Sequence, residues 1–242
     1  MSQLNFRFLR LRCQSMEMEI ALPDELPVMT LPNTAFFPQA LMPLHIFEPR
    51  YRQMLRDALA SNRLFAVAGL DLKMLKTPGH FEPPHRIASV GIIRACQEND
   101  NGTSNLLLQG LCRVEILNIV RDEPYRCIQI RALSSAAGGT EAENQELRRE
   151  LSRLLSFKLR LAATEAAGLT AFLKTVEDPE AFVDIAAFNL CDNIALKQKL
   201  LETLDVHRRL ELFGHQLRVE IESMKLRHQL QGGLPDDRVA EN

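Results

Sequence analysis

The sequence predicts an α+β protein in which a small β-barrel or twisted sandwich with one interrupting helix is followed by an α-helical bundle ending in a long helix. Three observations carry this prediction. Short apolar or alternating runs, typical of strands, recur through residues 25–134. Residues 134–140 (SSAAGGT) then form a linker of small residues. After this linker, apolar residues recur every three or four positions, which is the period of an amphipathic helix.

The strand-like part contains apolar runs separated by turn residues. They cover residues 26–31, 64–70, 87–94, 105–119 and 127–133. Pro27 and Pro32 enclose the first run, a pattern that favours an edge strand. Asn101-Gly102 is a hairpin signal before the long run, and Gly110 marks a bend within it. Strands of this length and spacing indicate a small barrel or sandwich.

One helix is expected inside this part, and it begins at Pro49, because proline suits the first position of a helix. The apolar residues that follow lie on one helical face, while charged and amide side chains occupy the other. These apolar residues are Tyr51, Met54, Leu55, Ala58 and Leu59. The helix should end near residues 61–62.

The second part is expected to be entirely helical. Its helices should cover residues 141–163, 169–176, 179–190, 194–203 and 206–230. The last helix carries a packing seam of Val206, Leu210, Phe213, Leu217, Ile221 and Met224, and Gly232-Gly233 ends it. This seam should pack on the bundle, with association into a weak homo-oligomer as the alternative. The predicted domains are an N-terminal extension (1–24), the barrel (25–134) and the bundle (141–231).

Composition argues against several classes of protein. The chain has 29 basic and 31 acidic residues, 6% aromatic residues and no Trp, so neither a basic face nor a stacking platform for nucleic acid is indicated. No apolar run approaches the roughly 20 residues that a membrane-spanning helix needs. The five cysteines are scattered and form no C-x-x-C motif. This pattern predicts reduced thiols in a cytoplasmic protein, rather than a disulfide framework or a zinc site.

The first fifteen residues contain three arginines and no acidic residue. We interpret them as an extension ahead of a domain that starts near Met16 or Met18. A transit peptide is the alternative, because such peptides are also rich in Arg and poor in acidic residues.

Motifs of the common enzyme classes do not occur in the sequence. No Gly is followed by Lys, so the end of a phosphate-binding P-loop is missing, and neither G-x-S-x-G nor H-E-x-x-H occurs. His80 and His85 flank a proline-rich stretch, for which an exposed loop is a better interpretation than a metal site that lacks a third ligand. A hydrolase has no support, because no nucleophile is spaced with a base. We expect no catalytic residue, metal or cofactor.

The most informative stretch is residues 31–52, LPNTAFFPQALMPLHIFEPRYR. Its prolines discourage both helix and central strand, and yet the stretch is strongly apolar. Such a segment either covers and closes the barrel, which we favour for most of its side chains, or presents apolar surface to a partner. The candidate contact residues are Phe36, Phe37, Leu41, Met42 and Ile46.

This stretch resembles the start of the amino-terminal domain of Lon protease, the LON substrate-binding domain. The matching residues are Leu26-Pro27-Val28-Met29-Thr30-Leu31-Pro32, Phe37-Pro38-Gln39, and Pro43-Leu44-His45-Ile46-Phe47-Glu48-Pro49-Arg50-Tyr51-Arg52. Further matches are Leu108-Gln109-Gly110-Leu111-Cys112-Arg113, Lys197-Gln198-Lys199-Leu200-Leu201-Glu202, and Asp205-Val206 with Arg209-Leu210. The resemblance covers about residues 25–230. One departure is Gln39, where the family usually has Gly.

The resemblance implies a PUA-like β-barrel followed by an α-helical bundle. It also implies a LON-domain protein of stand-alone form, because the ATPase module with its Walker A motif and the Ser-Lys protease domain of Lon are not in this sequence. In Lon proteases this region helps to recognise unfolded or tagged substrates and supports oligomerisation.

The leading functional hypothesis is a non-enzymatic protein that binds unfolded or exposed apolar polypeptide segments, in connection with protein quality control or proteolysis. Binding would use an apolar patch or an open barrel edge. Its partners would be polypeptide substrates or a protease, with no membrane. The alternative is an RNA-binding protein, because PUA-like barrels elsewhere hold RNA. The near-neutral charge and the lack of Trp count against this alternative.

Overall fold

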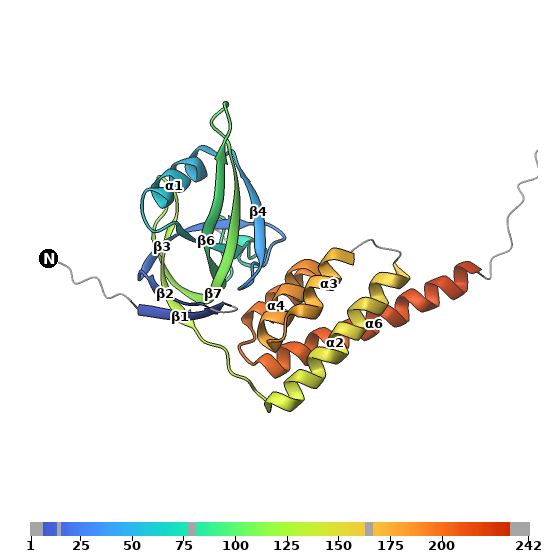
Figure 1. Cartoon of the computed structure of the whole chain (residues 1–242). Helices are drawn as coiled ribbons and strands as arrows, with labels where there is room; N and C mark the ends of the chain where they lie inside the picture. Colours follow the sequence, from blue (N-terminus) through green and yellow to red (C-terminus); the bar gives the residue numbers. More distant parts are fainter. Residues whose placement is uncertain (1–6, 14–15, 77–80, 163–166, 233–242) are drawn as a thin grey trace, which may run out of the picture. The chain divides into compact units, whose positions relative to one another are not determined.

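The computed structural model describes residues 7–13, 16–76, 81–162 and 167–232 (Figure 1). The chain divides into two compact units, which we call the barrel unit and the helical unit. The barrel unit comprises residues 1–135 and 187–204, and the helical unit comprises residues 136–186 and 205–242. The barrel unit therefore includes residues 187–204, which the sequence pattern assigns to the bundle.

The elements follow one another in the order that the resemblance implies, a strand-rich part and then helices. The strands are β1 (Arg7–Cys13), β2 (Met16–Leu22), β3 (Glu25–Leu31), β4 (Leu41–Ile46), β5 (Leu64–Gly69), β6 (Ile87–Glu98), β7 (Ser104–Arg121) and β8 (Cys127–Leu133). The helices are α1 (Pro49–Leu59), α2 (Glu141–Leu161), α3 (Ala167–Thr175), α4 (Pro179–Leu190), α5 (Ile194–Glu202) and α6 (Val206–Gly232), with a short 3₁₀ turn, η1 (Met74–Lys76). The α+β prediction is confirmed.

The main sheet has the strand order β4-β7-β6-β5-β3-β8 (Figure 1). Strand β8 also pairs with β7, which closes five strands into a barrel and leaves β4 hydrogen-bonded to β7 alone. All pairings are antiparallel except the one between β3 and β5. Strands β1 and β2 form a separate antiparallel two-stranded sheet, so part of the predicted extension, residues 7–13 and 16–22, is regular strand.

The prediction that residues 26–31 form an edge strand was wrong. Strand β3 lies inside the sheet, where residues 25–27 pair with β8 and residues 28–31 pair with β5. Pro27 is tolerated because it falls where the strand changes partner, and the next amide, that of Val28, donates to the Arg126 carbonyl oxygen at 3.0 Å. The edge strand is instead β4, which tolerates Pro43 because it pairs with β7 alone. The sequence pattern favoured irregular structure for these residues.

Residues 33–40, which we call the strap, lie against β6 and β7, on the face opposite to the barrel core residues Val90 and Val114. Phe36 and Phe37 are both 0% exposed. The Ser89 hydroxyl donates to the Phe36 carbonyl oxygen at 2.6 Å. The Gly110 amide donates to the Ala40 carbonyl oxygen at 2.9 Å. A Cβ atom at Gly110 would lie 2.0 Å from the Phe37 carbonyl oxygen, so only glycine permits this close approach.

Helix α5 packs on the barrel strands, which explains why it belongs to the barrel unit. Arg113 is 2% exposed, and its Nε donates to the Leu201 carbonyl oxygen at 3.0 Å. Gln198 donates to the Ile87 carbonyl oxygen at 3.2 Å. The rings of Phe36 and Phe188 meet edge to face, with centroids 6.1 Å apart. The helical period of this segment was read correctly, but periodicity does not reveal which core a helix covers.

A buried ion pair holds the helical unit together. Arg209 is 0% exposed and donates to Asp184, 1% exposed, at 2.5 Å and to Glu180 at 2.9 Å. The predicted seam of α6 is buried from Val206 to Ile221, so it packs within the unit. Thr140 and Glu143 form a capping box at the start of α2.

Gln39 occupies a backbone conformation that favours glycine, with φ at 63°. A left-handed conformation costs a side-chain-bearing residue roughly 1–2 kcal/mol. We therefore expect Gln39→Gly to raise the free energy of unfolding by about 0.5–1 kcal/mol, after allowance for the greater freedom of glycine in the unfolded chain. Urea denaturation would measure the change. Gln39→Ala, the control, should not stabilise the protein, and an equal gain from both variants would contradict this explanation.

The second prediction concerns the ion pair of the helical unit. Asp184→Asn leaves the buried guanidinium of Arg209 without its full counter-charge, which should lower the free energy of unfolding by about 3–5 kcal/mol. Chemical denaturation followed by circular dichroism would measure this. The exposed neighbour offers a control, because Arg208→Ala should cost less than about 1 kcal/mol. Similar stabilities of the two variants would show that the pair is not needed.

Candidate functional site

Large apolar side chains stand exposed on the connection between β5 and β6. They are Leu72 (55% exposed), Met74 (41%), Leu75 (43%) and Phe81 (72%). We call residues 70–76 and 81–86 the apolar loop. The preceding strand β5 is fully buried as far as Gly69, so the exposed surface begins directly where the chain leaves the barrel. Apolar side chains gathered on one exposed loop are typical of a binding surface.

The first half of the apolar loop is a tight turn organised by Asp71. The Oδ1 atom of Asp71 accepts from the amides of Lys73 at 2.9 Å and Met74 at 3.2 Å. The Leu75 amide donates to the Asp71 carbonyl oxygen at 3.0 Å. These bonds satisfy the backbone of the turn locally, so its apolar side chains need no cover from the barrel to keep their arrangement.

Backbone hydrogen bonds tie the two ends of the apolar loop together. The Asp71 amide donates to the Pro83 carbonyl oxygen, and the His85 amide donates to the Gly69 carbonyl oxygen, both at 2.8 Å. Asp71 and His85 also approach each other, with 3.8 Å between Oδ2 and Nδ1. His80, the other histidine of the metal interpretation, lies outside the described residues.

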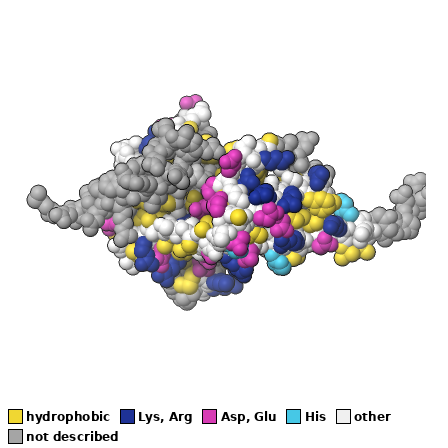
Figure 2. Space-filling model, turned by 60° about the horizontal axis from the view of Figure 1, so that its bottom comes forward, with side chains coloured by type: hydrophobic (Ala, Val, Ile, Leu, Met, Phe, Trp, Pro, Cys, Tyr) yellow, Lys and Arg dark blue, Asp and Glu magenta, His cyan; other side chains and the backbone are white. Residues whose placement is uncertain are grey.

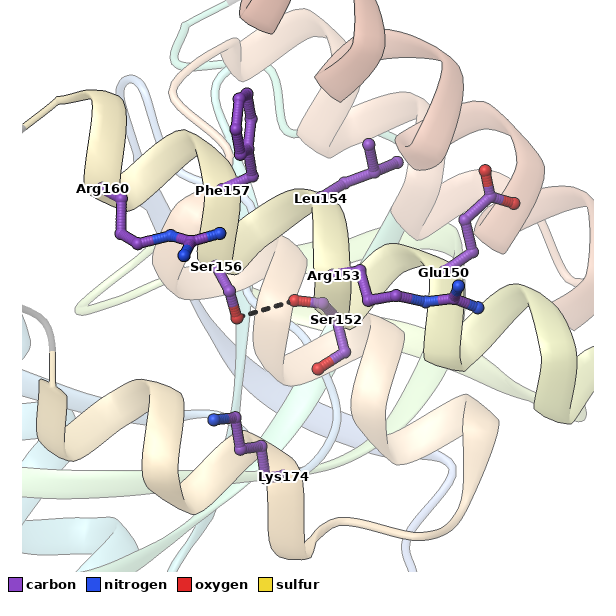
Figure 3. Close-up of a pocket in the computed structure, with 8 residues that line it drawn as sticks. All are labelled: Glu150, Ser152, Arg153, Leu154, Ser156, Phe157, Arg160 and Lys174. Atoms are coloured by element: carbon purple, nitrogen blue, oxygen red, sulfur yellow. Dashed lines mark hydrogen bonds between the residues drawn. The ribbon is translucent and has the colours of Figure 1, made fainter.

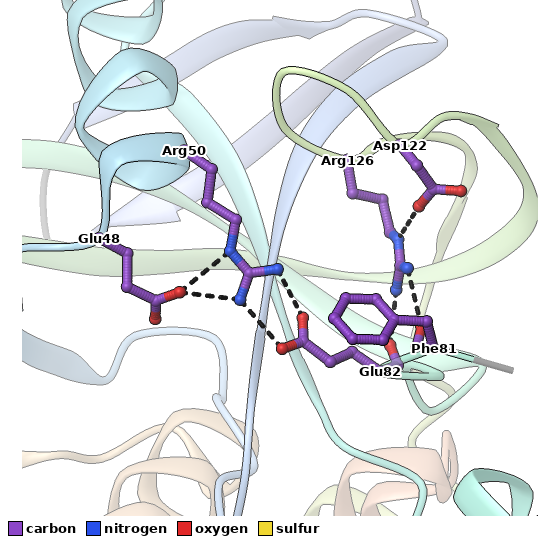
Figure 4. Close-up of polar contacts among 6 residues, drawn as sticks. All are labelled: Glu48, Arg50, Phe81, Glu82, Asp122 and Arg126. Atoms are coloured by element: carbon purple, nitrogen blue, oxygen red, sulfur yellow. Dashed lines mark hydrogen bonds and ion pairs between the residues drawn. The ribbon is translucent and has the colours of Figure 1, made fainter.

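Two arginines clamp the second half of the apolar loop (Figure 4). Arg50, from the start of α1, donates to both carboxylate oxygens of Glu82 at 2.7 and 3.0 Å and to Glu48 at 3.0 Å. Arg126 donates to the carbonyl oxygens of Glu82 at 2.5 Å and Phe81 at 2.9 Å. Bidentate charged bonds are strong and directional, so the clamp fixes the base of the loop.

The charge of the clamp is fixed as well as its geometry. The hydrogen bonds from Arg50 to the Glu82 carboxylate raise the pKa of Arg50 above its ordinary value. The guanidinium also lies 4.6 Å from the centre of the Tyr51 ring. Arg50 and Tyr51 both belong to the motif that carries the family resemblance. The structure gives the arginine of this motif a positioning role, which holds the apolar loop beside α1.

A second exposed apolar row lies on the edge strand β4 and the residue after it. Leu41, Pro43, His45 and Phe47 are exposed, whereas Met42 and Ile46 point inward. His45 Nδ1 lies 2.8 Å from Asn105 Oδ1, and the His45 ring stacks on Phe47 with centroids 6.1 Å apart. Phe47 directly precedes Glu48 of the clamp.

The structure therefore corrects the candidate contact residues. Phe36, Phe37, Met42 and Ile46 are buried, and only Leu41 among the five is exposed. The strap buries its two phenylalanines against β6 and β7, and strand alternation turns Met42 and Ile46 inward. The same alternation turns Leu41 outward. Any contact of a partner with this region falls on the outer face of β4.

Sequence reasoning missed the apolar loop. Its turn reads DLKMLK, with apolar residues beside lysines, and it is followed by a proline-rich stretch. That stretch was interpreted as an exposed loop. Residues 77–80 lie outside the described residues, and among residues 81–85 Phe81 is exposed, Pro83 is buried and the others are half-buried. The apolar residues of the stretch were not examined as a binding surface. Leucine and methionine in a segment too short to form a core element were the available signal.

The helical unit contains a cavity of about 580 Å³ on α2 and α3 (Figure 3). It is lined by Glu150, Ser152, Arg153, Leu154, Ser156, Phe157, Arg160 and Lys174. Glu150 bonds Arg218 and Arg153 bonds Glu146, so part of its polar lining is already paired. In Figure 3, Lys174 extends from α3 toward the side of α2 that carries Ser152 and Ser156, whereas Phe157 extends from α2 away from Lys174.

The charges of the described surface do not form a uniform field. In the face shown in Figure 2, basic and acidic side chains are interspersed, and hydrophobic side chains gather between them. Within the described ranges, no three His, Cys, Asp or Glu residues are grouped as metal ligands. No helix in the described part of the chain is both long and apolar enough to cross a membrane.

The clamp makes a prediction about the apolar loop. Arg50→Met keeps the length of the side chain but removes its bonds to Glu82. The loop should lose about 1 kcal/mol of local stability, which is about a fivefold rise in the opened population. Trypsin cleavage after Lys73 and Lys76, followed by mass spectrometry, should accelerate about fivefold. Arg52→Met, one helical position beyond Tyr51, should leave this rate unchanged, and equal cleavage of wild type and Arg50→Met would show that the clamp is dispensable.

Curated relatives of the chain are Lon proteases. It is 28% identical over 219 residues to the Lon protease of Dictyoglomus thermophilum, a match that covers 89% of this chain and 27% of the relative. It is 26% identical over 222 residues to the Lon protease of Desulfosudis oleivorans, covering 89% of this chain and 26% of the relative. The chain thus spans about a quarter of the length of these relatives.

Solved structures show the same fold. The N-terminal domain of Mycobacterium avium complex Lon protease matches 80% of this chain and 98% of that one, with a TM-score of 0.63 and 19% identity. The Lon N-terminal domain protein from Xanthomonas campestris matches 87% of this chain and 99% of that one, with a TM-score of 0.57 and 20% identity. The family model described as the ATP-dependent protease La (LON) substrate-binding domain matches residues 25–218, and the chain therefore belongs to the LON substrate-binding domain family.

Proposed function

We propose that this chain is a non-enzymatic protein that binds unfolded polypeptides, or exposed apolar segments of them, on the apolar loop of its barrel unit. One observation supports this most directly, namely four large apolar side chains exposed on a loop whose base is clamped by Arg50 and Arg126. The substrate-binding family to which the chain belongs gives the proposal its context. Leu41 and Phe47 on the outer face of β4 extend the proposed surface.

The energetics suit a weak and general binder. Full burial of a large aliphatic or aromatic side chain contributes about 1.5–3 kcal/mol. A polypeptide that covers several of these side chains also loses conformational and overall freedom, which offsets several kcal/mol of the gain. The net binding free energy is then about −6 kcal/mol, which corresponds to a dissociation constant of tens of micromolar. The clamped loop loses little conformational entropy when it binds, because its backbone is already ordered.

The proposal includes a link to proteolysis. The relatives that match this chain are named Lon proteases. A bound polypeptide would be passed to a proteolytic partner, and the reduced thiols expected from the sequence are consistent with a cytoplasmic setting. No described feature supplies a catalytic pair of its own, so the role assigned to this chain is recognition.

Removal of the apolar side chains tests the proposal. The double variant Met74→Ser, Phe81→Ser should weaken binding of a fluorescently labelled, reduced and alkylated protein at least about tenfold, because two exposed anchors are lost. Fluorescence anisotropy would measure the affinity. Stability should change little, since both side chains are exposed.

The matched control is Phe172→Ser, Leu226→Ser, which removes two exposed apolar side chains from the helical unit. It should bind like the wild type. No binding by the wild-type protein at tens of micromolar, or equal weakening by the two double variants, would contradict the proposed function.

A further inference from the structure

The carboxylates in and around the apolar loop already have partners. Glu48 and Glu82 bond Arg50, and Asp122 bonds Arg126 at 2.6 Å. Asp71 accepts from two backbone amides of its own turn and lies beside His85. Each of these carboxylates is therefore already engaged by an arginine or by backbone amides.

The lysines of the turn, in contrast to these carboxylates, have no partner among the described residues. Lys73 and Lys76 are exposed, and neither makes a side-chain hydrogen bond or ion pair with any residue that the structure describes. They are interleaved with Leu72, Met74 and Leu75. Two ammonium groups thus remain free on the same turn that carries three of the exposed apolar side chains.

The two lysines lie close together in the chain, because Lys76 ends the 3₁₀ turn Met74–Lys76 and Lys73 directly precedes it. Both are exposed, as are Leu72, Met74 and Leu75 between and beside them. The lysine stems add apolar surface, while their ammonium groups stay in water. The turn therefore offers exposed apolar side chains interleaved with two cationic groups.

From this charge complementarity, and resting on the proposed function, we infer that the preferred partner of the apolar loop is a polypeptide segment whose apolar residues are flanked by Asp or Glu. Acidic flanks meet Lys73 and Lys76, whereas basic flanks meet like charge. An anionic membrane surface is the competing occupant. It is disfavoured because two lysines provide little attraction and the whole chain has a net charge of −2.

Three short fluorescent peptides that share one apolar core and carry flanking Glu, Ser or Lys residues test this inference by anisotropy. At low salt the Glu-flanked peptide should bind the wild-type protein about three- to tenfold more tightly than the Ser-flanked peptide, and the Lys-flanked peptide should bind most weakly. The differences should shrink at high salt. Lys73→Glu, Lys76→Glu should reverse the order.

The matched control is Lys174→Glu, Arg227→Glu, which makes the same change of net charge on exposed residues of the helical unit. It should keep the wild-type order. Equal affinities for the three peptides would overturn the charge preference and leave the proposed function standing. Failure of all three peptides to bind would contradict both. Binding to vesicles of anionic lipid, lost in Lys73→Glu, Lys76→Glu, without any peptide preference, would assign the loop to a membrane surface instead.

Discussion

The close approach of the strap to Gly110 is the constraint on which the rest of the barrel unit depends. The Phe37 carbonyl oxygen lies where a side chain at position 110 would otherwise be. This contact lets Gly110 bond the strap on both sides, through the Gln39 amide and the Ala40 carbonyl oxygen. It keeps Phe36 and Phe37 buried against β6 and β7, where the Ser89 hydroxyl bonds the Phe36 carbonyl oxygen and the Arg113 guanidinium lies over the Phe37 ring.

This packing determines which apolar residues are left for a partner. Most of the apolar side chains of residues 31–52 are buried in the core. Those that remain exposed lie mainly on the outer face of β4. Four of the exposed large apolar side chains of the barrel unit lie on the loop between β5 and β6. That loop has no core of its own, so Arg50 and Arg126 fix it from outside. A surface ordered in this way loses less conformational entropy when it binds.

The sequence was sufficient to predict the strands with clear alternation, helix α1 and the seam of α6, because each depends on local periodicity. It did not reveal the edge position of β4 or the interior position of β3, because proline tolerance depends on which neighbour a strand pairs with. It could not assign α5 to the barrel, since the bonds of Gln198 and Arg113 join residues far apart in the chain. The candidate contact residues were taken from the apolar stretch 31–52 as a whole. Which of its side chains face outward depends on contacts with residues distant in the chain, so the sequence could not distinguish them.

Hydrogen exchange of the whole chain, with and without an unfolded polypeptide, tests the central claim most directly. Binding at the apolar loop predicts new protection of the backbone amides of residues 72–76, 81, 82 and 85, together with a smaller gain in protection along β4. The helical unit should exchange at unchanged rates. Protection confined to the helical unit, or absent from the apolar loop at saturating polypeptide, would contradict the account.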